Sequence, residues 1–188
     1  MRYYKLVYDF DNDDDYVILK SNSEMDIYDD DISNGKCISY WNIDTKFEYN
    51  EVEGKILSDY LAADNGWIVV SDRFCRIMSE LFEGAVQYLD VVVANKTTNE
   101  EYNTFKVLNV INHLNALDLD NSKYDVFEYG DNKVLSVEKY VLKKSILKNL
   151  HIFKLSDETI PVFVSESVKK LIENSFLTGF QFVEVKTI

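Results

Sequence analysis

The chain of 188 residues is 46% hydrophobic and 14% aromatic, and it carries a formal net charge of −13. At this length a folded chain buries roughly 70% of its unfolded surface, so it needs no disulfide or structural metal for stability. An acidic surface repels nucleic acid and anionic lipid, which argues against both as partners and favours a basic protein partner. Solubility alone is the alternative reason for the charge.

The two cysteines, Cys37 and Cys75, are too few for a disulfide scaffold. The first residues contain no long apolar run followed by a cleavage site of small residues. No stretch approaches the roughly 20 apolar residues of a membrane span. These features predict a cytoplasmic protein in a reducing compartment.

The first third of the chain holds most of the charge, because residues 1–65 contain 16 acidic and 6 basic residues, a balance of −10. Apolar and aromatic runs there predict strands, and polar acidic runs predict loops. The expected strands are Tyr3–Tyr8, Tyr16–Lys20 and Lys36–Ile43, the expected loops are Asp9–Asp15, Ser21–Gly35 and Asp44–Gly54, and a short helix is expected at Ile56–Ala63.

The next segment reads as a strand, a helix and a second strand. Apolar residues of the helix recur at i, i+3, i+4 and i+7, namely Phe74, Ile77, Met78 and Leu81. Ser71 is a good N-cap for this helix. The flanking strands are expected at 67–70 and 85–94. Further strands are expected at 102–111, 126–129, 134–142 and 151–155.

Residues 163–185 repeat the pattern of residues 69–91 without a gap. Five of 23 aligned positions are identical, among them Ser71 with Ser165 and Val91 with Val185. Two independent units with common capping chemistry are the alternative to a duplication. We predict an α+β fold with a mixed or antiparallel sheet and two similar strand–helix–strand units. Residues 1–65 are expected to form an acidic, β-rich part, and residues 66–188 the part that contains the duplicated unit; one continuous domain is the alternative.

The search for chemistry finds no phosphate-binding loop, no dinucleotide glycine pattern and no zinc motif in the sequence. His113 and His151 each have apolar neighbours, which favours structural roles. The aspartates at 9, 11 and 13 imitate a calcium loop, but Asp14 stands where glycine is required and Lys20 where glutamate is required. We therefore predict no catalytic residues, no metal and no cofactor.

The acidic residues instead suggest a partner-binding surface. If the first three strands form an antiparallel meander, the first and third connections lie at the same end. The loop at 29–31 then lies about 17 Å away, at the other end. The predicted binding residues are Asp11, Asp13, Asp14, Asp15, Trp41, Asp44 and Glu48. Trp41 is the candidate anchor, whereas Trp67 is expected in the core.

Several stretches resemble a known family in order and spacing. They are GWIVVSDRF (66–74), GAVQYLDV (84–91), VLNV (107–110), ALDLDNS (116–122), FVSESVK (163–169) and LTGFQF (177–182). Together they resemble the immunity proteins of bacterial polymorphic toxin systems, in the α+β family typified by a myxobacterial member. One departure is Phe176, where a glycine is expected before LTGF; Asn174 could supply the left-handed residue instead.

The resemblance implies a protein that is not an enzyme. It would sit in the cytoplasm of the toxin-producing cell, bind a cognate toxin domain and block it stoichiometrically. The alternatives are a small carboxylate-dependent hydrolase and an adaptor module without a toxin partner. Toxin domains that attack anionic targets have basic clefts, so we expect a partner with a basic face.

Overall fold

The computed structural model describes residues 1–11, 15–129 and 132–188. Strands make up 42% of the chain and helices 13%, so the protein is predominantly β and the predicted α+β class is wrong. The helices are α1 (Asp26–Ser33), α2 (Asp72–Met78) and α3 (Glu166–Asn174). The strands are β1 (Tyr3–Tyr8), β2 (Ile18–Leu19), β3 (Lys46–Tyr49), β4 (Tyr60–Ala63), β5 (Ile68–Ser71), β6 (Val86–Asn95), β7 (Glu101–Val110), β8 (His113–Leu114), β9 (Lys123–Tyr129), β10 (Asn132–Lys139), β11 (Val141–Leu142), β12 (Ile152–Leu155), β13 (Val162–Ser165) and β14 (Phe180–Thr187).

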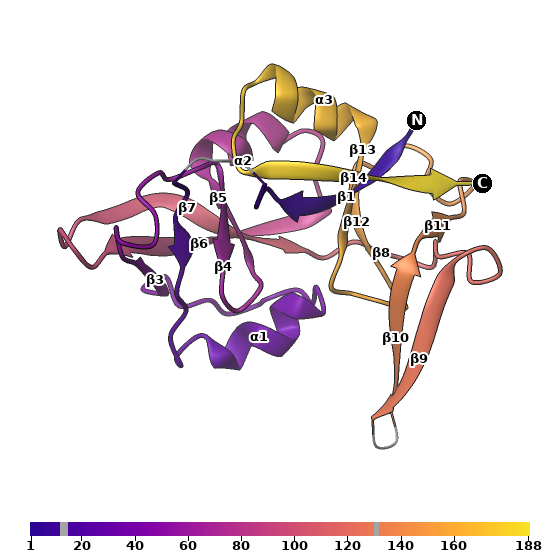
Figure 1. The fold of residues 1–188 in the computed structure, drawn as a ribbon, viewed down its shortest axis with the longest axis horizontal. Coiled ribbons are helices and arrows are strands. Elements are labelled where there is room, and N and C mark those ends of the chain that lie inside the picture. The colour runs from indigo at the N-terminus through magenta and orange to yellow at the C-terminus, as the bar shows by residue number, and fades with distance from the viewer. Residues whose placement is uncertain (12–14, 130–131) are drawn as a thin grey trace.

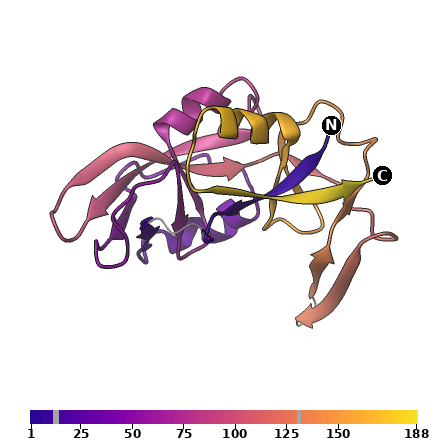
Figure 2. The ribbon, with the colours of Figure 1, turned by 45° about the horizontal axis from the view of Figure 1, so that its top comes forward.

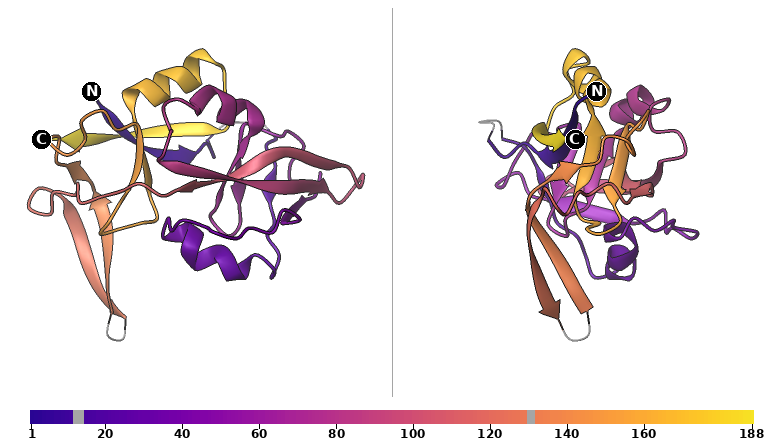
Figure 3. Two further views of the ribbon diagram at one scale, coloured as in Figure 1. Left: turned by 180° about the vertical axis from the view of Figure 1, so that it is seen from behind. Right: turned by 90° about the vertical axis from the view of Figure 1, so that its right-hand side faces the viewer.

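The strands form two six-stranded sheets and a two-stranded ribbon. The sheet orders are β2-β4-β5-β7-β6-β3 and β11-β14-β1-β13-β12-β8, and the ribbon is β9-β10. Figure 1 shows α2 and α3 together on one side of the molecule, α1 on the opposite side, and the ribbon projecting away from the body. Figure 3 shows the same separation of the ribbon from two further directions.

The two sheets have the same pattern of pairing. In each sheet both outermost strands pair in parallel with their neighbours, and the three inner pairings are antiparallel. The register agrees as well. In each sheet, one residue of an inner strand, β7 or β1, pairs with two residues that are identical in the sequence repeat. These trios are Ser71, Phe105 and Val91 in one sheet and Ser165, Tyr3 and Val185 in the other. The gap-free sequence repeat thus has a structural counterpart that covers the whole sheet.

The central strand of the second sheet comes from the N-terminus. The first sheet uses β2, β3, β4, β5, α2, β6 and β7 in chain order, and the second uses β8, β11, β12, β13, α3 and β14, with β1 in the place of β7. Tyr3 faces Val185, so the two ends of the chain lie close together (Figure 1). In this order α1 lies between β2 and β3, and the β9–β10 ribbon lies between the corresponding strands β8 and β11. The boundary at residue 65 remains a proposal that rests on composition.

Both helices of the repeated units begin at a serine. The Ser71 side chain accepts a hydrogen bond from the Phe74 N–H at 3.1 Å, and the Ser165 side chain accepts one from the Val168 N–H at 3.4 Å. Each bond satisfies one of the backbone donors that a helix start leaves unpaired. The apolar faces of α2 and α3 then pack into one buried cluster that strands of both sheets share, and Figure 2 shows the two helices side by side above them.

The predicted loop at 21–35 contains a helix, α1, and that expectation was wrong. Met25, Tyr28 and Ile32 are buried, and their spacing of three and four residues places them on one helical face. The aspartates between them gave the segment the composition of a loop, but Asp26 and Asp30 are exposed on the helix, and Asp29 and Asp31 are half-buried. Periodicity was therefore the better guide here than composition.

Two other expectations in the first third were also wrong. The helix predicted at 56–63 is replaced by β4, because pairing with β5 overrides an apolar spacing that also suits a helix. The strand predicted at 36–43 is absent from the described structure of that segment. There the Gln87 side-chain amide donates to the Ile38 carbonyl and its oxygen accepts from the Ile38 N–H, so a side chain takes the role of a neighbouring strand.

Candidate functional site

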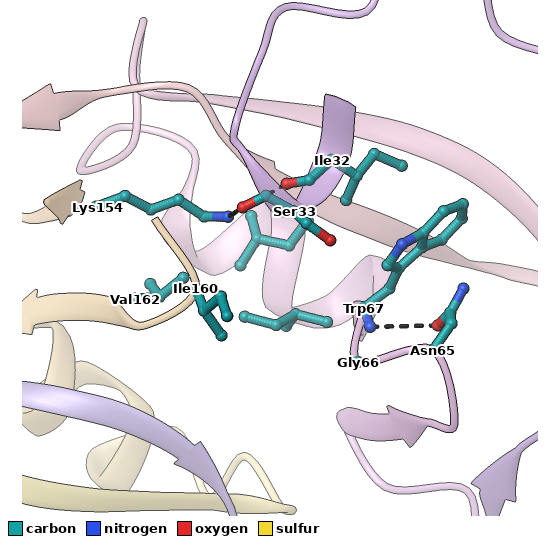
Figure 4. A pocket seen from close by; sticks show the side chains of 10 residues that line it. Ile32, Ser33, Asn65, Gly66, Trp67, Lys154, Ile160 and Val162 are labelled. Atoms are coloured by element: carbon teal, nitrogen blue, oxygen red, sulfur yellow. Dashed lines mark hydrogen bonds between the residues drawn. The ribbon is translucent and has the colours of Figure 1, made fainter. Parts of the chain in front are cut away.

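A cleft lies where the two sheets meet, between the turn that joins β4 to β5 and the loop that joins β12 to β13. It consists of an inner cavity of about 210 Å³ and an outer cavity of about 340 Å³. Both cavities are lined by Gly66, Trp67, Ile68, Ile160 and Val162, so we treat them as one feature, the junction cleft. Figure 4 shows residues of α1, the β4–β5 turn, β12 and the β12–β13 loop around the inner cavity.

Turn chemistry positions one wall of the junction cleft. Gly66 has a φ of +80°, a conformation that glycine adopts without strain, and its N–H donates to the Ala63 carbonyl at 2.9 Å. The Trp67 N–H donates to Asn65 Oδ1 at 3.2 Å. The turn directs Trp67 into the core, where it is 3% exposed, as the sequence predicted.

A buried cation closes the inner end of the cleft. Lys154 on β12 is 6% exposed, and its ammonium donates to the carbonyls of Ser33 at 2.8 Å and Ile32 at 3.2 Å. These carbonyls belong to the last turn of α1, where the helix dipole is negative and favours a cation. Burial lowers the pKa of Lys154 to about 8, because the charged form loses its hydration. Lys154 therefore connects α1, which precedes β3 of the first sheet, to β12 of the second sheet by hydrogen bonds.

Three buried polar atoms gather beside the cleft: Asp29 Oδ1, Asn65 Nδ2 and Trp67 Nε1. None makes a hydrogen bond of standard geometry to the part of the chain that the structure describes. Burial raises the pKa of Asp29, and the nearby N–H groups of Trp67 and Asn65 oppose this rise. The three groups are thus close enough to interact electrostatically, although their alignment is poor.

The outer cavity has an apolar entrance. Phe10 and Ile160 line it and are 72% and 79% exposed. Acidic residues flank the lining in the sequence: Asp11 follows Phe10, Asp64 follows Ala63, and Asp157 lies in the β12–β13 loop. All three of these carboxylates are on exposed residues.

The predicted binding residues fall into two groups. Asp11 is exposed and accepts a hydrogen bond from the Gln181 side chain of β14 at 2.8 Å. Trp41, Asp44 and Glu48 lie along the β3–β6 edge of the other sheet: the Trp41 indole N–H donates to the Asp90 carbonyl at 2.7 Å. The Thr45 carbonyl next to Asp44 accepts from the Val92 N–H, and Glu48 pairs with Lys96 at 2.7 Å.

The meander that was to unite these residues is not formed. β1 lies in one sheet and β2 in the other, and the third strand is not present. Asp13 and Asp14 lie outside the described residues. Asp15 is exposed, and its carbonyl accepts from the N–H groups of Lys55 and Ile56. A role of these carboxylates in binding stays a prediction.

Trp41 is less free than an interface anchor would be. It is half-buried, and its ring lies 4.6 Å from the Tyr28 ring and 6.0 Å from the Trp67 ring, measured between centroids. Its indole N–H is already bonded to the backbone of β6. The packing ties Trp41 to α1 and to the core beneath it.

The hydroxyls of Ser165 and Ser71 and the thiol of Cys75 could act as nucleophiles by residue type, but their surroundings indicate structural roles. His151 Nδ1 lies 2.9 Å from Ser165 Oγ, but Ser165 is fully buried and caps α3. In the equivalent position of the first half, the Ser71 hydroxyl donates to Asp59 Oδ1 at 2.6 Å. Burial raises the pKa of the Cys75 thiol to about 12, which keeps it protonated at neutral pH.

Two further findings concern ligands and membranes. Among the described residues, no group of three or more His, Cys, Asp or Glu side chains is placed to hold a metal ion. No described helix has the length and apolar character to cross a membrane.

The residues of the junction cleft were not recognised in the sequence. Phe10 and Ile160 are isolated apolar residues in acidic loops, and this contrast was the available signal. Lys154 lies within an apolar strand, and the residues around it in the sequence do not indicate that α1 covers it. Spatial proximity of the two halves creates the cleft, so local patterns do not reveal it.

No curated protein matches the chain. The model of the Immunity protein family (Imm11) matches residues 2–187, which is almost the whole chain and includes the first third that the sequence motifs had left out. The chain therefore belongs to the Immunity protein family (Imm11).

Proposed function

We propose that this protein is an immunity protein that binds a cognate bacterial toxin domain stoichiometrically and neutralises it in the cytoplasm of the producing cell. The observation that carries the proposal is the family match over residues 2–187. The buried capping role of Ser165 and the protonated state of the buried Cys75 thiol also favour binding over nucleophilic catalysis.

We further propose that the partner presents a basic face. Residues 1–65 carry a balance of −10, and such a field accelerates association with a basic surface at low ionic strength. Asp11, Asp15 and Asp44 are exposed and suited to this role. Neither nucleic acid nor a cofactor is part of the proposed mechanism.

The test is co-expression with the toxin domain encoded beside the gene for this chain. Cells that produce the toxin domain alone should die, and cells that also produce this protein should survive. The purified pair should form a complex with a fixed ratio of subunits in sedimentation or light-scattering experiments. Survival without a complex, together with turnover of a substrate by the purified protein, would show that it acts as an enzyme instead.

A further inference from the structure

The outer cavity of the junction cleft leaves two large apolar side chains in solvent. Phe10 and Ile160 are 72% and 79% exposed, although each lies beside an apolar lining that could cover it. Phe10 touches the body through its edge contact with the Tyr8 ring, at 4.7 Å between centroids. Large apolar side chains that rim a hollow are typical of interaction sites, whereas scattered single ones are not.

The size and lining of the hollow suit a side chain better than a metabolite. About 340 Å³ is at the lower end of the range of ligand pockets, roughly 300–1,000 Å³. Its lining is mostly apolar and includes the small residues Ala62, Ala63 and Gly66, together with Tyr8, Tyr60 and Lys5, whose side chains have polar tips. A Cβ added at Gly66 would meet no atom within 4 Å, so this part of the wall is open. One or two aromatic or aliphatic side chains of a partner would fill the space.

The charges at the rim favour a basic partner segment. Asp11, Asp64 and Asp157 are exposed, and Asp64 remains accessible while it accepts hydrogen bonds from the Ser21 N–H and hydroxyl. Of the two lysines in the lining, Lys154 directs its ammonium to the carbonyls of α1. The other, Lys5, lies over the Tyr140 ring at 5.7 Å from its centroid. The Lys154 charge is therefore buried and the Lys5 charge is directed to an aromatic ring, whereas the three carboxylates that neighbour the lining in sequence are exposed.

We propose that the outer cavity is the docking site for an apolar anchor of the cognate toxin domain, an aromatic or long aliphatic side chain flanked by Lys or Arg. This inference rests on the proposed function and adds the surface and the chemistry of recognition. Buried aromatic and aliphatic anchors in pockets, surrounded by polar rims, carry most of the affinity of protein interfaces. The anchor would cover Phe10 and Ile160, and the flanking cations would meet the acidic rim.

The experiment uses full-length protein and the toxin domain encoded beside its gene, with affinity measured by calorimetry. Phe10→Ala and Ile160→Ala should each weaken binding at least about fivefold, and the double variant should weaken it further. Matched controls are Phe176→Ala and Phe127→Ala, whose wild-type side chains are 82% and 57% exposed and lie outside both the cleft and the predicted acidic binding residues. The controls should bind like the wild type. Circular dichroism and thermal unfolding should show that all variants fold.

The outcomes distinguish failure of the proposed docking site from failure of the proposed immunity function. If the wild type protects cells and binds the toxin domain, but the two cleft variants bind as tightly as the controls, the docking site is wrong and the immunity function stands. If the wild type neither protects nor binds, the proposed function fails first. A wild-type dimer that dissociates in the Phe10 and Ile160 variants, with toxin binding unchanged, would assign the cleft to self-association and overturn the proposal.

Discussion

Lys154 makes the stability of this protein depend on pH in a direction that can be calculated. Its ammonium is 6% exposed, and burial lowers its pKa from 10.5 to about 8. Between these two pH values the unfolded chain holds a proton that the folded chain has released. The free energy of unfolding should therefore rise with pH across this window, and the Lys154 contribution should be constant below it.

The size of the effect follows from the shift in pKa. One unit corresponds to about 1.36 kcal/mol, so Lys154 should contribute roughly 3 kcal/mol of added stability between pH 8 and pH 10.5. At neutral pH the buried charge opposes folding, while its hydrogen bonds to the Ser33 and Ile32 carbonyls offset part of that cost. The pH dependence is therefore a cleaner measure of the desolvation than the stability at a single pH.

The assay is urea unfolding of the wild type and of Lys154→Met at several pH values from 6.5 to about 10.5. Taking the difference between the two proteins cancels the tyrosines that titrate in both of them. The wild type should gain stability relative to the variant as the pH rises. Lys148→Met, which removes an exposed ammonium, is the matched control and should show a much smaller change. A difference that stays flat, or that moves against the wild type with rising pH, would refute the burial argument for Lys154.

Three further predictions concern the caps, the charge and the repeat. Ser71→Ala and Ser165→Ala should each lower the free energy of unfolding by about 1 kcal/mol in urea titrations, because each side chain caps a helix; unchanged stability in either variant would count against the cap. Reversal of Asp13 and Asp14 to lysine should slow association with the toxin domain several-fold at low salt, with less effect as salt rises; rates insensitive to both changes would show that this charge does not steer binding. A circular permutant with joined termini and a new opening between β7 and β8 should keep its strand content by circular dichroism, because each half then becomes continuous; an unfolded permutant would contradict the equivalence of β1 and β7.

Local patterns in the sequence were sufficient for the repeated units. The spacing of Phe74 and Met78 and the serines at 71 and 165 follow from helix geometry and from the chemistry of an unpaired helix start. The strands expected at 85–94 and 102–111 are likewise formed, as β6 and β7, each ten residues long. The order of the motifs also predicted membership of an immunity protein family, which the match over residues 2–187 confirms.

Contacts between distant segments decided the remainder. β1 reads as an edge strand of a local meander, but its pairing partners β13 and β14 lie more than 150 residues further along the chain. β4 has the apolar spacing of a helix and becomes a strand because β5 offers a ladder of hydrogen bonds. The junction cleft and the burial of Lys154 arise where two similar halves meet, and no local window contains both walls. Strand pairing and burial are properties of segments brought together in space, so periodicity and composition specify the pieces without specifying their neighbours.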